Sequence, residues 1–317
     1  MMPRFNPMVT ARVRSLARSF DRMFGNRFPY GRGSATGPQA AGLNRAIPMI
    51  ERILFPVDFS PCCASMAPYV SRAAEMFGAC VSLVHVCDLA SHNGFELLVR
   101  MPQEIAEEHQ GIAEERLRSF LDAEFPPAAC ARILRSGEAA EQIAEVARSG
   151  GFDLIVMPTH ASRFRRTLLG STTAKVLNDA DCPVLTTEHA EGKSPRPLEH
   201  RVWACAIGLS QDSERVLRLA SRAAAAAGAQ LSVIHAAGDP VAQDARRRLD
   251  ELLGKAGCGA AVQIAMGPVK KVLLEAACRS GADVLIVGRR PRAGAFGRLR
   301  DLTYSLIRDS PFPVLSV

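Results

Sequence analysis

Two small groups of residues have the types and positions that could bind an anionic ligand. Gly170, Ser171 and Thr172 stand at the start of an expected helix, and Asp58 directly follows a short apolar run at 53–57. The first N–H groups of a helix have no partner within that helix, so they can bind anions such as phosphate. A carboxylate at the end of a strand can accept hydrogen bonds from a ligand. These residues predict a ligand site if the fold brings them together.

Common catalytic signatures are missing from the sequence. It contains no G-x-S-x-G, H-E-x-x-H or G-x-x-x-x-G-K-[ST] pattern, and its cysteines show no metal-ligand spacing. His85 and His235 end matching apolar runs, so we expect both to be structural histidines. We expect His160 to have a polar role in a loop rather than an acid–base role. We therefore expect a protein that is not an enzyme, with no catalytic residues and no metal site.

The elements that would position these residues alternate along the chain. Apolar, β-branched runs predict five strands, at 53–57, 81–86, 131–134, 153–157 and 183–187. The stretches between them predict four helices, at 64–77, about 103–124, 138–148 and from about 171. Each return of a parallel strand needs a crossover, so this alternation is typical of a parallel sheet with helices on both faces. The expected fold class is α/β, in the form of a doubly wound domain.

A repeat divides the chain into two copies of this plan. Leu231–His235 matches Val81–His85 at an offset of 150, and Gly281–Val287 matches Gly151–Met157 at an offset of 130. The second copy is thus 20 residues shorter, between its second strand and its second helix. The repeat predicts two tandem domains. We expect a basic, flexible extension at 1–48, a first domain at 49–190, a polar, proline-bearing linker at 191–199 and a second domain at 200–317.

Several segments of the first copy resemble the universal stress protein (UspA-like) family. In chain order they are MIERILFPVDFS at 49–60, LVHV at 83–86, MPTHA at 157–161, LLGS at 168–171 and DCPVL at 181–185. The resemblance covers about 53–187 and 201–317, which identifies the chain as a tandem member. It implies a stress-type regulatory protein whose domains have five strands each. We expect these strands in the order 3-2-1-4-5, with the two copies packed as an intrachain pseudo-dimer through their fifth strands.

The resemblance also implies a site for ATP or another adenine nucleotide in the first domain. The phosphates would bind the N–H groups of Gly170, Ser171 and Thr172, and the base and ribose would lie between Asp58 and Val86. The full set of expected nucleotide-binding residues is Pro56, Val57, Asp58, Val86, Met157, Thr159, His160, Gly170, Ser171 and Thr172.

The first copy departs from the phosphate-binding loop of the family, which reads G-x-x-G, nine residues, then G-[ST]. Pro158 and Ala161 replace the two leading glycines, and only eight residues, 162–169, precede Gly170. Proline removes a donor, and alanine resists a positive φ. Three arginines in this loop could supply charge for phosphate; they are Arg163, Arg165 and Arg166. The alternative is a solvated loop without ligand, in which Ser171 caps the helix.

The second copy keeps fewer of these features. Gly208 replaces the acid after the first strand, Pro291 replaces the second glycine, and Arg300-Asp301 replaces Gly170-Ser171, so that only Gly288 remains. An acid at a helix start satisfies the N–H groups internally and repels phosphate. Five arginines leave an anion site open there; they are Arg289, Arg290, Arg292, Arg298 and Arg300. We expect a structural partner rather than a second nucleotide site.

The distribution of charge limits the kinds of partner that the protein could have. Residues 1–50 carry eight arginines and one acid, Asp21, whereas the rest of the chain is neutral overall, so we expect no sequence-specific nucleic acid partner. Apolar residues at helical spacing within 8–24 predict a basic amphipathic helix for an anionic membrane surface or an acidic partner. This arginine-rich segment also resembles an organelle transit peptide.

The nine scattered cysteines are typical of reduced thiols, and no apolar run is long enough to span a bilayer, so we expect a cytoplasmic protein. The adjacent Cys62 and Cys63 could instead form a redox pair.

Two functions of different class remain open at this point. The first is a nucleotide-responsive stress protein with ATP in its first domain. The second is a ligand-free interaction module whose tandem domains form the pseudo-dimer, with a homodimer as a further assembly. A slow ATPase ranks third.

Overall fold

The computed structural model describes residues 50–87, 103–159, 169–187, 201–237, 242–289 and 301–317. The predicted amphipathic helix within 8–24 and the predicted linker at 191–199 lie outside the described residues. No helix in the described ranges is long and apolar enough to cross a membrane.

The first copy (residues 49–187) contains five strands with helices between them. Its strands are β1 (Arg52–Pro56), β2 (Cys80–Cys87), β3 (Ala131–Ser136), β4 (Leu154–Pro158) and β5 (Val184–Thr187). Its helices are α2 (Pro61–Ala64), α3 (Ala67–Phe77), α4 (Gln103–Ser119), α5 (Ala139–Ser149) and α6 (Ser171–Asp179).

The second copy (residues 201–317) repeats this order. Its strands are β6 (Val202–Ala206), β7 (Gln230–Ala237), β8 (Ala261–Met266), β9 (Val284–Val287) and β10 (Val314–Ser316). Its helices are α7 (Ser213–Ala226), α8 (Ala242–Ala256), α9 (Val269–Arg279) and α10 (Asp301–Asp309).

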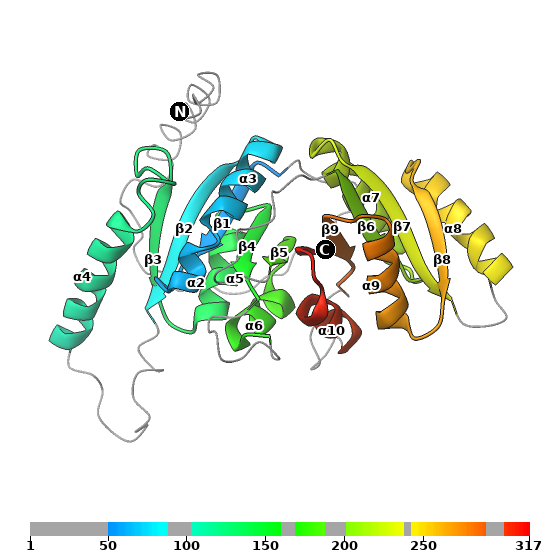
Figure 1. Ribbon diagram of the computed structural model, residues 1–317. Coiled ribbons are helices and arrows are strands. Elements are labelled where there is room, and N and C mark those ends of the chain that lie inside the picture. Colours follow the sequence, from blue (N-terminus) through cyan, green and yellow to red (C-terminus); the bar gives the residue numbers. More distant parts are fainter. Residues whose placement is uncertain (1–49, 88–102, 160–168, 188–200, 238–241, 290–300) are drawn as a thin grey trace, which may run out of the picture. The chain divides into compact units, whose positions relative to one another are not determined.

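All ten strands join in one sheet of order β3-β2-β1-β4-β5-β10-β9-β6-β7-β8. Each half of this sheet is parallel and has the order 3-2-1-4-5 within its own copy, which confirms the predicted fold (Figure 1). The halves meet where β5 pairs antiparallel with β10, and Leu185 faces Leu315 at the centre. The matching hydroxyls of Thr186 and Ser316 each donate to a carbonyl of the opposite strand. This symmetric register is that of a pseudo-twofold pair within one chain.

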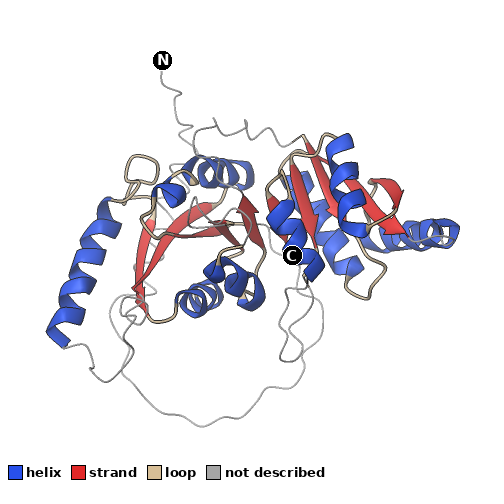
Figure 2. Cartoon of the chain, turned by 60° about the horizontal axis from the view of Figure 1, so that its bottom comes forward, coloured by secondary structure: helices blue, strands red, loops and turns tan. Residues whose placement is uncertain are grey.

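Alternating side chains of the strands build a core on each face of the sheet, and helices cover both faces (Figure 2). In β1, Ile53 and Phe55 pack toward α3, whereas Leu54 packs toward α5 and α6. This period of two places apolar residues on both faces, as a strand buried between two helix layers requires. All three side chains are fully buried.

Two of the predicted helices have wrong bounds. The helix expected at 64–77 begins only at Ala67, as α3, with Pro68 in its first turn, where a missing N–H costs no intrahelical bond. The short helix α2, which ends at Ala64, was not predicted. The helix expected to reach 124 ends at Ser119, close to Leu121, whose φ of 54° is incompatible with a right-handed helix.

Identical polar contacts hold the frame of both copies. The Asp153 carboxylate accepts the N–H groups of Glu51 and Arg52, both at 3.0 Å, where β1 begins. In the second copy, Asp283 accepts the N–H groups of Arg201 and Val202 at 2.6 and 2.9 Å. Each aspartate thereby ties the chain before the fourth strand to the start of the first.

Candidate functional site

A cavity of about 500 Å³ lies beyond the carboxyl ends of β1, β2 and β4 in the first copy. Strand β1 has β2 on one side and β4 on the other, and the chain crosses from β3 over to β4, so the cavity sits at the point where the strand order reverses. Open α/β sheets bind their ligands at such points. Helices α5 and α6 supply further walls through Ala139, Ile143 and the first turn of α6.

Eight of the ten predicted site residues line this cavity, and they are Pro56, Val57, Asp58, Val86, Met157, Gly170, Ser171 and Thr172. Thr159 does not: it is buried, and its N–H donates to the Thr187 carbonyl at 3.1 Å. His160 and the three loop arginines lie outside the described residues. The prediction missed eight lining residues: Cys63, Val84, His85, Ala139, Ile143, Pro158, Leu169 and Thr173. Val84 could have been found from the sequence, because it shares a face of its strand with Val86.

The first turn of α6 presents backbone donors to the cavity. The helix begins at Ser171 with Gly170 as its N-cap residue, and no side chain in the described part of the chain caps it. The prediction was wrong for Gly170, because its N–H donates to the Thr159 carbonyl at 2.8 Å. The alternative in which Ser171 caps the helix is wrong as well. The donors that α6 offers to an anion are therefore the N–H groups of Ser171, Thr172 and Thr173, which precede the first intrahelical bond, from the Ala174 N–H to the Gly170 carbonyl. Of the predicted donors, Ser171 and Thr172 remain.

Gly170 has φ of −58°, which any residue adopts, so the backbone does not need glycine at this position. What glycine supplies is the missing side chain, which lets a ligand come close to the start of α6.

Asp58 lines the same cavity, in the loop after β1. Its Oδ1 accepts the Ser60 N–H at 2.9 Å and the Ser60 hydroxyl at 2.6 Å. The Ser60 hydroxyl oxygen in turn accepts the Cys63 N–H at 3.0 Å and caps α2. These contacts hold an exposed carboxylate at the mouth of the cavity.

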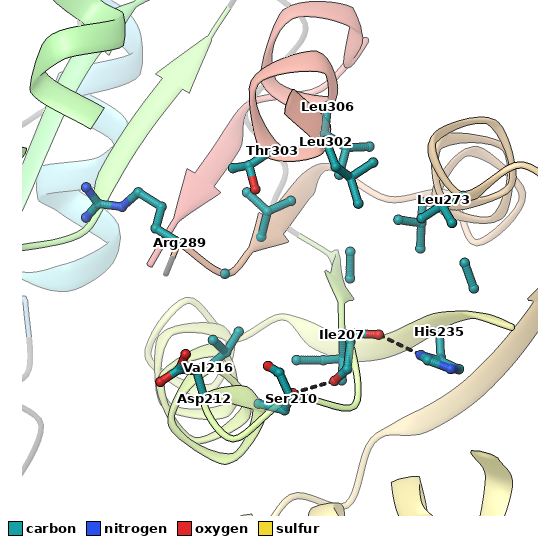
Figure 3. Close-up of a pocket in the computed structure, with 17 residues that line it drawn as sticks. Ile207, Ser210, Asp212, Val216, His235, Leu273, Arg289, Leu302, Thr303 and Leu306 are labelled. Carbon is teal, nitrogen blue, oxygen red and sulfur yellow. Dashed lines mark hydrogen bonds between the residues drawn. The ribbon is translucent and has the colours of Figure 1, made fainter. Parts of the chain in front are cut away.

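The second copy has a smaller cavity of about 290 Å³ at the equivalent place (Figure 3). Gly208 stands at the position of Asp58 and supplies no carboxylate. Helix α10 begins at Asp301, the position that Ser171 occupies in the first copy.

The Arg289 side chain does not offer an anion site in the second cavity. It points away from the other labelled residues, toward the first copy (Figure 3). Its guanidinium donates to the carbonyls of Leu177, Ala180 and Cys182 at 2.6, 3.1 and 2.6 Å. Of the five arginines that left an anion site open, Arg289 is thus engaged with the first copy instead. Arg290, Arg292, Arg298 and Arg300 lie outside the described residues.

Comparison with known proteins identifies the first copy. Residues 49–187 match the sequence model of the universal stress protein family. These residues are a universal stress protein domain. A universal stress protein of Methanocaldococcus jannaschii is 25% identical over 158 residues, which cover 44% of this chain and 96% of that protein.

Solved structures extend the likeness in fold to both copies. A universal stress protein from Archaeoglobus fulgidus aligns with 84% of this chain and 97% of its own, at 23% identity and a TM-score of 0.67. A functionally unknown protein from Pseudomonas aeruginosa aligns with 86% of this chain and 94% of its own, at 17% identity and a TM-score of 0.59. The second copy therefore shares the fold of a universal stress protein domain.

Both predicted structural histidines of the universal stress fold make the same contact. Nδ1 of His85 donates to the Val57 carbonyl at 2.7 Å, and Nδ1 of His235 donates to the Ile207 carbonyl at 2.8 Å. His235 is buried, whereas His85 is half-buried and lines the larger cavity. Burial is the main cause that lowers the pKa of His85, which favours the neutral ring that donates to Val57.

His85 also supports the loop that carries Asp58. The ring of Phe59 stacks on it with centroids 4.2 Å apart, and the guanidinium of Arg116 covers the Phe59 ring at 4.7 Å. Phe59 has φ of 61°, a left-handed conformation that costs energy in a residue with a bulky side chain. The two ring contacts fix this turn and hence the direction of the neighbouring carboxylate.

The Cys62–Cys63 pair lacks the features of a redox site. Both side chains are buried, and neither forms a disulfide. Burial is the largest cause that raises the pKa of Cys63 far above its usual range, and the nearby Asp58 carboxylate acts in the same direction. A thiol that keeps its proton is a poor nucleophile, so Cys63 serves as an apolar wall of the cavity.

Proposed function

We propose that this universal stress protein binds ATP or another adenine nucleotide in its first domain and acts as a nucleotide-responsive regulator. The observation that carries the proposal is the pairing of two features in one cavity. Uncapped N–H groups of Ser171 and Thr172 and the exposed carboxylate of Asp58 line the same cavity. Phosphates can accept hydrogen bonds from the first feature, and a ribose or base can donate to the second.

The walls between these two features suit a nucleoside. Val57, Val86 and Met157 are apolar and line the cavity between the loop after β1 and the start of α6. A volume of about 500 Å³ falls within the range of small-molecule sites. In the proposed pose the base contacts Val86, the ribose hydroxyls donate to Asp58, and the phosphates accept from Ser171 and Thr172.

We propose binding rather than catalysis as the role of this site. Among the described lining residues, the two side chains that could act as a base, Asp58 and His85, already have structural partners: Asp58 accepts from Ser60, and His85 donates to Val57. Nine free cysteines are consistent with the reducing cytoplasm, which we propose as the location.

One observation favours the alternative of a ligand-free interaction module. The Gly170 N–H is engaged with Thr159, so the start of α6 has fewer donors than the full motif would offer. Pro158 has no N–H to replace it. The two functions differ in whether the full chain binds nucleotide at all.

Titration calorimetry of the full chain with ATP separates them. Asp58→Asn keeps an oxygen for Ser60 but removes the charge, so the dissociation constant should rise by roughly 10-fold, the difference between a charged and a neutral hydrogen bond. The matched control is Gly208→Ala, at a position with open space around its Cα, and it should leave the dissociation constant unchanged. No detectable binding at millimolar ATP would favour the interaction module.

A further inference from the structure

Helix α6, whose first turn faces the cavity, is held at both ends by side chains of the second copy. At its N-terminal end the Leu169 N–H donates to the hydroxyl oxygen of Tyr304 on α10 at 3.1 Å. At its C-terminal end Arg289 donates to three carbonyls. These contacts are distinct from the pairing of β5 with β10, which joins the two sheets.

The Arg289 contact suits the C-terminal end of α6. The last carbonyls of a helix have no partner within that helix, and the helix dipole places partial negative charge there. Leu177 belongs to the last turn of α6, Ala180 is its C-cap residue, and Cys182 follows in the next turn of the chain. The Arg289 residue is only 4% exposed, so its guanidinium bonds in a site shielded from water.

The Tyr304 contact acts next to the proposed phosphate donors. Leu169 lines the cavity and directly precedes Gly170, the N-cap residue of α6. Fixing the Leu169 N–H fixes the peptide that leads into the first turn, and with it the direction of the N–H groups of Ser171 and Thr172. Tyr304 itself does not line the cavity.

At the two matched positions, the first copy makes no equivalent contact to the second. The first copy has Thr159 at the position of Arg289, and the Thr159 hydroxyl is 3.5 Å from the Thr187 carbonyl of its own copy. It has Ala174, which has no polar side chain, at the position of Tyr304. At these two matched positions the support therefore runs from the second copy to the first.

We propose that the second copy is a built-in positioning partner for the nucleotide site of the first, with Tyr304 and Arg289 as positioning residues. This inference rests on the proposed function. The two side chains orient α6 so that its first N–H groups meet the phosphates, and they touch neither the base nor the ribose. Their contribution is therefore confined to ligands that carry phosphate. Because coupling is reciprocal, ATP stabilises the same contacts when it binds.

The test compares ATP with adenosine on the full chain and on Tyr304→Phe, which removes only the hydroxyl. ATP affinity should fall by about 5-fold, the effect of one net hydrogen bond, while adenosine affinity stays within about 2-fold of the wild type. Arg289→Lys, which keeps the charge but loses most of the hydrogen-bonding geometry, should likewise weaken ATP binding and leave adenosine affinity within about 2-fold of the wild type. The control is Ser305→Ala on the same helix, whose hydroxyl donates to the Leu302 carbonyl within α10, and it should change neither affinity.

A second measurement needs no nucleotide. Amide hydrogen exchange at residues 169–173 should be faster in Tyr304→Phe than in the wild type, because the Leu169 N–H loses its acceptor. Equal losses of ATP and adenosine affinity, or unchanged ATP affinity and unchanged exchange, would overturn the positioning role. A wild-type chain that binds no ATP would instead overturn the proposed function, and the positioning of phosphate donors with it.

Discussion

The two copies of the fold share the contacts that hold their frame and differ in the groups that would meet a ligand. Asp153 and Asp283 tie their strands in the same way, as do His85 and His235 through Nδ1. The loop after the first strand, by contrast, carries Asp58 in one copy and Gly208 in the other. The helix that follows the fourth strand begins with Ser171 in one copy and with Asp301 in the other. The same architecture is thus compatible with the presence or absence of a site.

The two copies also differ in what their residues at the position of Arg289 contact. In the second copy this side chain leaves the region of its own cavity and bonds the end of α6 in the first copy. A position next to one candidate site has thereby become part of the support for the other. Two unequal copies can divide binding and support between them, whereas two equal copies would each need both.

The largest effect should come from giving the first copy the residue of the second. Ser171→Asp places a carboxylate where phosphate would bind, and two like charges about 6 Å apart repel by roughly 3 kcal/mol at an effective dielectric constant of about 20. The dissociation constant for ATP should rise by about 100-fold, measured by titration calorimetry. Stability should not fall, because an acid in the first turn favours the helix dipole.

The reciprocal change, Asp301→Ser, is the control for this swap, and it should leave ATP affinity at the first site unchanged. An Ser171→Asp chain that binds ATP as tightly as the wild type would show that phosphate does not lie at the start of α6.

The next largest effect should be a loss of stability that is equal for matched changes in the two copies. Asp153→Ala and Asp283→Ala each remove a carboxylate that accepts two backbone N–H groups. Each change should lower the free energy of unfolding by about 2 kcal/mol, measured by urea denaturation. A cost confined to one copy would mean that the frames are not equivalent. Asp283→Ala should leave ATP affinity unchanged, because Asp283 does not line the first cavity.

The smallest effect should be the pH dependence that His85 adds. Burial lowers its pKa below the ordinary 6.5, and Arg116 acts in the same direction, whereas Asp58 and the bond to Val57 oppose the shift. The unfolded chain therefore takes up this proton first as pH falls, so stability decreases from about pH 6.5 down through the lower folded pKa. In His85→Asn the drop in Tm between pH 7.5 and pH 5 should be smaller than in the wild type. An equal drop in both would assign the pH dependence to other groups.

Local sequence patterns predicted the fold because each element has its own signature. Short apolar, β-branched runs such as 53–57 located the strands, and the two offsets of the repeat located the second copy. The cavity followed from the same logic, since Asp58, Met157 and Ser171 all stand at strand ends or a helix start on one edge of the sheet.

Contacts between distant residues could not be predicted in this way. The bond from the Gly170 N–H to Thr159 depends on how a loop closes, and the Arg289 side chain crosses to another copy. Helix α4 ends at Ser119 because Leu121 has a left-handed conformation, and a leucine in the sequence does not predict that conformation. The link between Leu169 and Tyr304 joins residues 135 positions apart, and only the packed structure brings them together.

The central claim is that one chain binds one nucleotide, in the first copy. Native mass spectrometry of the full chain with ATP tests it most directly, because bound molecules are counted per chain. We expect one ATP on the wild type, one on Asp301→Ser, and none on Ser171→Asp at a concentration near the wild-type dissociation constant. Two ATP molecules per chain, or one that persists at wild-type occupancy on Ser171→Asp, would contradict it.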